Sequence, residues 1–314
     1  MTTTMLERGP ELSGKQPERK ARGHTAMNTE GTVTYELRAG VAWLGLNRPH
    51  KRNAIDTALL AQFEAAVRRA QDEARALVVF GHGRCFSAGL DLAEHRAREP
   101  EEVFHHSRHW HAAFSLLRHG RIPVIAALHG ATIGGGLELA AACQIRIADE
   151  TTFFALPEGA RGIYVGGGAS VYVARLLGVS RVADMMLTGR VLDAAIAMQA
   201  GLVQYLVPEG EAKSKAQELA AKMSSMAPLT VLGVLHALPR IQDMSEADGL
   251  FVESLMAALA QSGAEAAARL ADFVGKRAAK VTSPAESLIA VSRGAASGIA
   301  AAADSDEPAV IKRT

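Results

Sequence analysis

The sequence predicts an α/β fold, and three features of its pattern support this prediction. Short apolar runs of strand length alternate with longer amphipathic segments up to about residue 208. Glycine clusters follow several of these runs, as is typical of turns between strands and helices. From about residue 209 to residue 280 the pattern is entirely helical. Because the chain is rich in alanine and only 5% of its residues are aromatic, we expect helices to dominate.

Six short runs have the length and composition of β-strands. The first two alternate between apolar and polar positions and are separated by Arg38-Ala39-Gly40, which indicates a hairpin. Pro49 follows the second strand, since proline cannot continue a ladder of hydrogen bonds. The runs at 77–80 and 124–128 are continuously apolar, which is typical of buried strands. In chain order, the predicted strands cover 32–37, 41–46, 77–80, 124–128, 145–148 and 202–207.

Helices are predicted between and after these strands. The first is capped by Asp56 or Thr57 and carries apolar residues at helical spacing, among them Leu59 and Phe63. A segment rich in alanine and leucine follows Gly134-Gly135-Gly136 and also indicates a helix. The remaining helices are predicted over 101–117, 169–177, 180–187, 194–200, 211–226, 228–238, 246–261 and 263–279.

The chain divides by composition into four regions. Residues 1–30 are polar and mixed in charge, without the apolar stretch of a secretory signal, so we predict a disordered extension. Residues 31–208 contain all the predicted strands, and residues 209–281 contain only helices. Residues 282–314 are rich in alanine, serine and aspartate, which indicates a second disordered segment.

Charge and cysteine content exclude several classes of protein. A net charge of +1 argues against binding nucleic acid through a basic surface. Cys85 and Cys143 are the two cysteines and do not form a CxxC pair, so a reducing compartment is predicted rather than a disulfide framework. No apolar run reaches the ~18 residues that a membrane span requires. We therefore predict a cytoplasmic protein with no nucleic-acid partner and no membrane span.

Two glycine-containing loops can present main-chain N–H groups to a ligand. One is Ser87-Ala88-Gly89-Leu90, and the other is Gly134-Gly135-Gly136 at the predicted start of a helix. Two N–H groups directed at one carbonyl oxygen would stabilise an oxyanion or enolate, and removing one such donor costs ~3–4 kcal/mol in a characterised enzyme. Taken singly, each loop is equally consistent with an ordinary tight turn.

Two glutamates lie close to these loops in the sequence. Glu138 is in the first turn of the predicted helix, and Glu158 follows Pro157 after the next strand. Such a pair can serve as general acid and base, and the apolar neighbours of Glu138 predict burial, which raises a carboxyl pKa. The simpler interpretation is a charge favoured by the helix dipole at Glu138 and a loop charge at Glu158.

Five histidines and a tryptophan gather on the helix predicted at 101–117 and just beyond it. His105 and His109 are one helical turn apart, as zinc ligands can be, but HExxH is absent and no further ligand has fixed spacing. We therefore predict no metal site and interpret the segment as a helix that lines a pocket or faces solvent. The cluster consists of His105, His106, His109, Trp110, His111 and His119.

Five motifs, which occur in one order, resemble the crotonase, or enoyl-CoA hydratase/isomerase, superfamily over about residues 31–281. They are NRPHKRNA (47–54), FSAGLDL (86–92), HGATIGGGLELAAACQIRIA (129–148), FALPE (154–158) and MLTGRVLDAAIAMQAGLVQYLV (186–207). The resemblance implies a spiral of β-β-α turns with two roughly perpendicular sheets and a C-terminal helical region that trimerises. It also implies a homotrimer or dimer of trimers. Coenzyme A would be part of a thioester substrate, with no separate cofactor.

The resemblance also implies roles for individual residues. The N–H groups of Leu90 and Gly135 would hold the thioester oxygen. Glu138 would orient the attacking water as base and Glu158 would donate a proton, which favours hydration of a trans-2-enoyl-CoA to a 3-hydroxyacyl-CoA. Coenzyme A contacts are implied at Arg52, Ala54, Ala88, Leu90, Gly134, Gly135, Gly166, Phe273 and Lys276. An ordinary surface charge or core aromatic remains the alternative for Arg52, Phe273 and Lys276.

Departures from the family pattern leave the substrate and the reaction open. Gln144 replaces a common aspartate, Ala155-Leu156 replaces the usual Gly-Gln before Pro157, and Tyr164-Val165 replaces small residues or proline. His106, His109 and Trp110 lie in a segment that varies among relatives and borders the acyl pocket, so they could shape selectivity or be structural. The alternatives are an enoyl-CoA isomerase, a C–C hydrolase acting on a diketone, or a non-catalytic trimer that binds coenzyme A or RNA.

Overall fold

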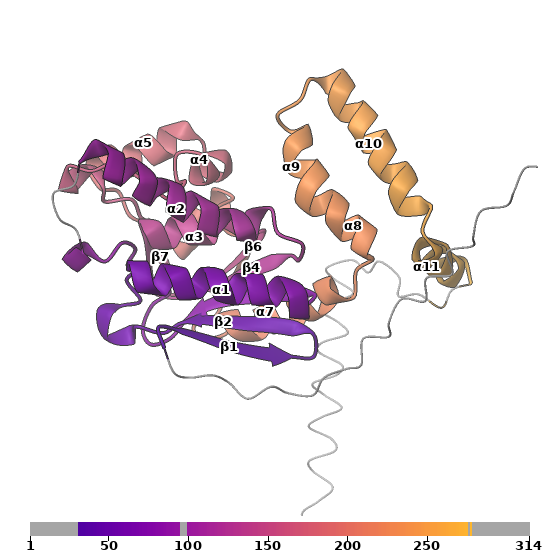
Figure 1. Cartoon of the computed structure of the whole chain (residues 1–314), viewed down its shortest axis with the longest axis horizontal. Coiled ribbons are helices and arrows are strands. Elements are labelled where there is room, and N and C mark those ends of the chain that lie inside the picture. The colour runs from indigo at the N-terminus through magenta and orange to yellow at the C-terminus, as the bar shows by residue number, and fades with distance from the viewer. Residues whose placement is uncertain (1–30, 95–98, 276, 278–314) are drawn as a thin grey trace, which may run out of the picture. The chain divides into compact units, whose positions relative to one another are not determined.

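The computed structural model describes residues 31–94, 99–275 and 277 (Figure 1). Two segments that were predicted to be disordered, 1–30 and 282–314, lie outside the described residues. Lys276 also lies outside them. Contacts divide the chain into two compact units, one ending at Met256 and one beginning at Ala257. The proposed boundary between a spiral core and a helical region at 208/209 stays a prediction.

A six-stranded sheet forms the base of the first unit. Its order is β1-β2-β3-β4-β6-β9, with β1 antiparallel to β2 and every other neighbouring pair parallel. Ala39 and Gly40 both have positive φ, 46° and 78°, which is the backbone that a two-residue hairpin turn requires. The predicted hairpin is thus present. The strands are β1 (Val33–Arg38), β2 (Val41–Leu46), β3 (Ala76–Gly81), β4 (Val124–Leu128), β6 (Ile145–Asp149) and β9 (Tyr205–Val207).

A second, three-stranded sheet was not predicted strand by strand. It has the order β5-β7-β8, formed by β5 (Ala131–Ile133), β7 (Phe153–Ala155) and β8 (Leu192–Asp193). β5 and β7 are parallel with Ile133 opposite Ala155, and the N–H of Gly134 donates to the carbonyl of Ala155 at 2.9 Å. This pairing brings the chain after β5 beside the chain after β7.

Helices cover both faces of the six-stranded sheet. α1 runs alongside β1 and β2 (Figure 1), and it joins α2 and α3 in the larger apolar core. α7 packs on the opposite face against β3 and β4 in a smaller core. The helices of the first unit are α1 (Thr57–Glu73), α2 (Pro100–Arg118), α3 (Gly135–Ala142), α4 (Tyr172–Leu177), α5 (Val179–Thr188), α6 (Ala194–Gln199), α7 (Ala212–Ser224), α8 (Pro228–Leu232) and α9 (Leu238–Ile241).

Several helix boundaries have clear local causes. Asp56, not Thr57, caps α1, and its carboxylate accepts from the N–H of Leu59 at 2.8 Å. α10 (Glu246–Gln261) matches its prediction and crosses from the first unit into the second, which also contains α11 (Ala264–Val274). Short 3₁₀ turns are η1 (Pro49–Lys51), η2 (Leu92–Glu94) and η3 (Gly159–Arg161).

The single helix predicted at 228–238 is interrupted. A π-helical turn, η4 (Gly233–Ala237), separates α8 from α9. Pro239 follows directly in α9, and proline has no N–H and clashes with the carbonyl four residues earlier, that of Leu235. The wider π turn is a common way to accommodate such a break.

Candidate active site

The site is built around the start of α3. β5 ends at Ile133, and Gly134 then turns the chain into the helix with φ of 51°, a left-handed conformation that favours glycine. Glu138 lies in the first turn of α3, as predicted. The first N–H groups of a helix have no partner within it, so the amide of Gly135 is available to a ligand.

The amide of Leu90 lies beside that of Gly135. A Cβ placed on Gly135 would be 3.5 Å from the Leu90 nitrogen, and one placed on Gly89 would be 3.0 Å from the Gly135 nitrogen. Within the described residues, neither N–H donates a hydrogen bond to another protein group. The Ser87 hydroxyl fixes the first loop by accepting from the Gly89 N–H at 3.1 Å and donating to the Asn53 carbonyl at 2.8 Å.

Glu138 is buried, with 3% of its surface exposed. One carboxylate oxygen, Oε1, accepts hydrogen bonds from the main-chain N–H groups of Gly167 at 2.8 Å and Ala169 at 2.9 Å. Burial raises the Glu138 pKa to about 7. The two amides oppose this shift and the negative charge of Glu158 adds to it. Sequence reasoning missed these amides, although the glycine run at 166–168 was a signal for exposed N–H groups.

Glu158 approaches the same helix start from β7, the strand that pairs with β5. It follows β7, is also buried, and its Oε1 lies 2.5 Å from the point where a Cβ on Gly134 would be. Its other oxygen, Oε2, is buried and has no hydrogen-bond partner among the described residues. Burial raises the Glu158 pKa, while the charge of Arg161 opposes that shift.

The structure therefore brings four of the predicted groups together. The N–H groups of Leu90 and Gly135 lie side by side, and Glu158 contacts the residue before Gly135. Glu138 is close enough for the charge of Glu158 to affect its pKa. Such a site can bind a carbonyl oxygen through the two amides. The carboxylates can then exchange protons with carbon atoms next to that carbonyl group.

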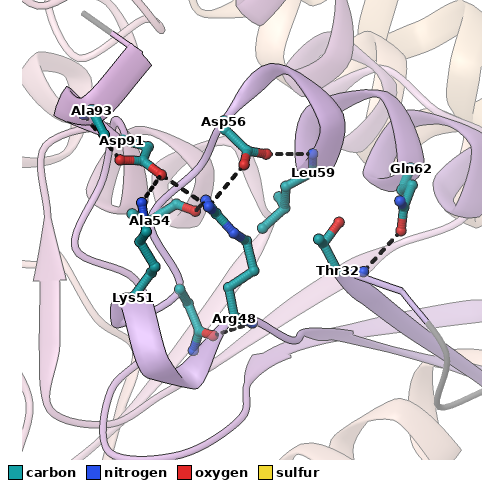
Figure 2. A network of polar contacts seen from close by, with 10 residues as sticks. Thr32, Arg48, Lys51, Ala54, Asp56, Leu59, Gln62, Asp91 and Ala93 are labelled. Carbon is teal, nitrogen blue, oxygen red and sulfur yellow. Dashed lines mark hydrogen bonds and ion pairs between the residues drawn. The ribbon is translucent and has the colours of Figure 1, made fainter.

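Arg48 anchors the loop that leads into this site (Figure 2). Its guanidinium forms ion pairs with Asp56 and Asp91, both at 2.9 Å, and donates to the Ala54 carbonyl at 2.7 Å. Burial alone would raise the pKa of Asp91, but hydrogen bonds from the Ala93 N–H, Arg48 and Lys51 hold it below its ordinary value. Sequence reasoning missed this network.

Residues 36–284 match the family model described as enoyl-CoA hydratase/isomerase. The chain belongs to the enoyl-CoA hydratase/isomerase family. The crotonase-like α/β fold predicted from the five motifs is thereby confirmed, as is the prediction that the protein is a hydratase-like enzyme.

Relatives of known sequence or structure agree with this assignment. A probable mitochondrial enoyl-CoA hydratase of Arabidopsis thaliana is 36% identical over 220 residues, which is 69% of this chain and 73% of that protein. An enoyl-CoA isomerase/hydratase of Mycosarcoma maydis is 34% identical over 68% of this chain and 82% of its own length. The crystal structure of a putative enoyl-CoA hydratase from Rhodopseudomonas palustris is 49% identical, with a TM-score of 0.77 over 80% of this chain and 97% of that one.

Four of the nine residues with implied coenzyme A contacts lie on the two loops that carry the amide pair: Ala88, Leu90, Gly134 and Gly135. The Ala88 N–H donates to the carbonyl of Arg52 at 2.9 Å, and Ala54 is buried next to the Arg48 network. The Gly166 carbonyl, next to Gly167 in the chain, accepts from the Ser107 hydroxyl at 2.6 Å.

Two of the implied coenzyme A contacts, Phe273 and Lys276, are near the C-terminal end of the described residues. Phe273 is an exposed residue of α11 in the second unit. Lys276 lies outside the described residues. Contact of either residue with coenzyme A stays a prediction.

The histidines of α2 do not gather around a common point, because their side chains have different partners. His105 lies 3.7 Å from Glu101 on the same helix, and His109 lies 3.5 Å from Glu64 of α1. Over the part of the chain that the structure describes, no three His, Cys, Asp or Glu side chains are placed to hold a metal ion. No described helix is both long and apolar enough to span a membrane. The cytoplasmic location stays a prediction.

Proposed function

We propose that this family member adds water across the 2,3 double bond of a trans-2-enoyl-CoA to give a 3-hydroxyacyl-CoA. The observation that supports this most directly is the presence of two buried carboxylates beside two available amides. The family model covers isomerases as well as hydratases, so this choice within the family is our own inference.

The thioester oxygen would accept hydrogen bonds from the N–H groups of Leu90 and Gly135. Attack of water at Cβ moves negative charge onto this oxygen, and two preorganised amides stabilise the resulting enolate. The positive end of the α3 dipole, at Gly135, favours the same charge. These groups would therefore bind the enolate more strongly than the substrate, which lowers the barrier.

The two carboxylates would carry out the two proton transfers, one from water and one to Cα. Ionised Glu138 takes a proton from water as its oxygen bonds to Cβ, and protonated Glu158 delivers a proton to Cα. One proton then passes from Glu138 back to Glu158, directly or through solvent, to restore the starting state. Burial raises both pKa values, and an ionised Glu158 further raises that of Glu138, so the pair favours holding one proton near neutral pH. With that proton on Glu158, the charge that raises the Glu138 pKa is absent and Glu138 is the ionised member.

The test is hydration of crotonyl-CoA, followed by the loss of absorbance of the conjugated enoyl thioester. Glu138→Gln and Glu158→Gln should each lower kcat by about 10²–10⁴-fold, the usual contribution of a general acid or base. Glu150→Gln, at an exposed turn after β6, is the matched control and should leave the rate unchanged. Wild-type rates in both site variants would refute the proposal.

Product analysis separates hydration from isomerisation. A hydratase gives 3-hydroxybutyryl-CoA from crotonyl-CoA. An isomerase would instead convert a 3-enoyl-CoA to its 2-enoyl isomer, in a reaction that depends on Glu158 and survives Glu138→Gln. Binding of coenzyme A thioesters without any turnover would favour the non-catalytic alternative.

We also propose that the chain assembles as a homotrimer or a dimer of trimers. Large apolar side chains on α10, among them Leu250, Phe251 and Leu255, are more than half exposed in the single chain. Apolar surface of this kind commonly marks a protein–protein interface. Light scattering coupled to gel filtration tests this, and a monomer at micromolar concentration would contradict it.

A further inference from the structure

Trp110 of α2 lies directly on the main chain of the candidate site. Its ring atoms are 2.5 and 2.8 Å from the point where a Cβ on Gly135 would lie, and 3.1 Å from the corresponding point on Gly167. Only glycine at both positions permits so close an approach. The indole is 5% exposed, so it fills space that solvent does not reach.

The same two glycines carry the groups proposed to act on the substrate. The Cβ point on Gly135 is also 3.5 Å from the Leu90 nitrogen, and the one on Gly167 is 2.5 Å from Oε2 of Glu138. Trp110 therefore borders both the amide pair and the Glu138 carboxylate. A carbon chain held at the amides and directed past Glu138 would approach this ring.

The ring is held in place from several sides. Phe114 packs against it edge to face, with ring centroids 5.5 Å apart, and His106 lies on it at 6.0 Å. The Ser107 hydroxyl ties the same helix to the Gly166 carbonyl at 2.6 Å. Moving the indole aside would disturb these contacts in a close-packed interior, where such changes are poorly tolerated.

We propose that Trp110 closes the acyl pocket and restricts the enzyme to short 2-enoyl chains. This inference rests on the proposed hydration for its substrate class. Carbon atoms beyond Cγ, the last carbon of a crotonyl chain, would need the volume that the indole occupies. Trp110 is thus a specificity-determining residue, with no part in the proton transfers.

The experiment compares crotonyl-CoA with trans-2-decenoyl-CoA in wild type, Trp110→Phe and Trp110→Ala. The ratio of kcat/KM for the long chain to that for the short chain should rise about 10-fold or more in Trp110→Ala, because the pocket gains room for several methylene groups. Trp110→Phe keeps an aromatic ring against Phe114, so it should fold like wild type and give a smaller rise. His105→Ala is the control, since His105 is on the same helix but is exposed beside Glu101, and its ratio should equal that of wild type.

Binding of saturated thioesters provides a readout that needs no turnover. Calorimetry with butyryl-CoA and decanoyl-CoA should show the same change in preference for the longer chain in Trp110→Ala. Trp43 and Trp110 are the two tryptophans of the sequence, so in a Trp43→Phe background the emission of Trp110 should change when either thioester binds.

The outcomes separate this inference from the proposed reaction. Active hydration with an unchanged length preference in both folded Trp110 variants would overturn the inference and leave the reaction standing. A changed binding preference in a protein that hydrates no enoyl-CoA would support the role of Trp110 and refute the reaction.

Discussion

Oε1 of Glu158 lies 2.5 Å from the point where a side chain on Gly134 would begin. Gly134 also has φ of 51°, a conformation that strains any residue with a Cβ. We therefore expect Gly134→Ala to displace the Glu158 carboxylate and to lower kcat/KM for crotonyl-CoA by about 100-fold, the usual effect of misplacing a reacting group by ~1 Å.

A control for this substitution comes from Gly189, at the end of α5. Its φ is 73° and nothing lies within 4 Å of its Cβ position, so Gly189→Ala introduces the backbone strain of a positive φ without a clash. It should destabilise the fold by ~1–2 kcal/mol and leave kcat/KM unchanged. Equal losses of activity in the two variants would mean that backbone strain, not contact with Glu158, is responsible.

The raised pKa of Glu138 predicts that stability depends on pH. Burial moves this pKa from 4.5 to about 7, so between these values the folded protein keeps a proton that the unfolded chain releases. Stability from this group is therefore full below pH 4.5 and is lost as pH rises through about 7, by up to ~3 kcal/mol. Urea unfolding of wild type and Glu138→Gln at pH 5 and pH 8 measures it.

Glu138→Gln should lose less stability than wild type over this pH interval, because glutamine does not titrate. Glu150→Gln removes an exposed charge instead and serves as the control. A difference in unfolding free energy between wild type and Glu138→Gln that stays constant with pH would contradict the assignment.

The buried ion pairs of Arg48 predict that removing this one charge lowers the free energy of unfolding substantially. Arg48→Met would leave Asp56 and Asp91 without their shared cation in a mostly buried position. Removing one partner of a buried ion pair typically costs ~3–5 kcal/mol, so we expect a loss of this size in urea unfolding. Arg121→Met, which breaks an exposed pair with Asp72, should cost less than ~1 kcal/mol. Similar losses in both variants would show that the Arg48 pairs behave as surface pairs.

Both cysteines should resist alkylation in the native protein. Cys143 and Cys85 are buried, and burial raises the pKa of the first to about 12 and also raises that of the second. Because the thiolate is the reactive form, native protein at pH 7.5 should remain unmodified by iodoacetamide while the urea-unfolded chain is alkylated at both sites. Mass spectrometry reads this directly, and rapid modification of the native thiols would show that these positions open readily.

The sequence predicted long elements better than short ones. The first five strands of the six-stranded sheet and α10 were placed closely because their apolar patterns are local, whereas β9 begins at Tyr205, three residues after the predicted start at 202. β5 and β7 have three residues each and are strands because they pair with one another across the 19 residues at 134–152, an effect that no local pattern contains. The break at residues 233–237 was missed because Pro239 lies inside an otherwise helical pattern.

For the site, the sequence identified the groups that we propose to react but not what surrounds them. Leu90, Gly135, Glu138 and Glu158 follow from motifs, and the structure places them together. The contact of Trp110 with two glycines joins α2 to loops distant in sequence, and the Arg48 network joins charges from three separate segments. Interactions of this kind form only in the folded chain, so no characteristic spacing of residues in the sequence predicts them.

The parallel pairing of β5 with β7 has a consequence for how this chain can vary in length. Ile133 lies opposite Ala155, so main-chain hydrogen bonds, rather than the number of residues in between, set how far Gly134 is from Glu158. Insertions at the exposed turn at residues 150–151 can therefore accumulate without moving either residue. One residue added between Ala155 and Glu158 would instead carry the carboxylate out of its position, so tolerance to insertion should change abruptly within a few residues.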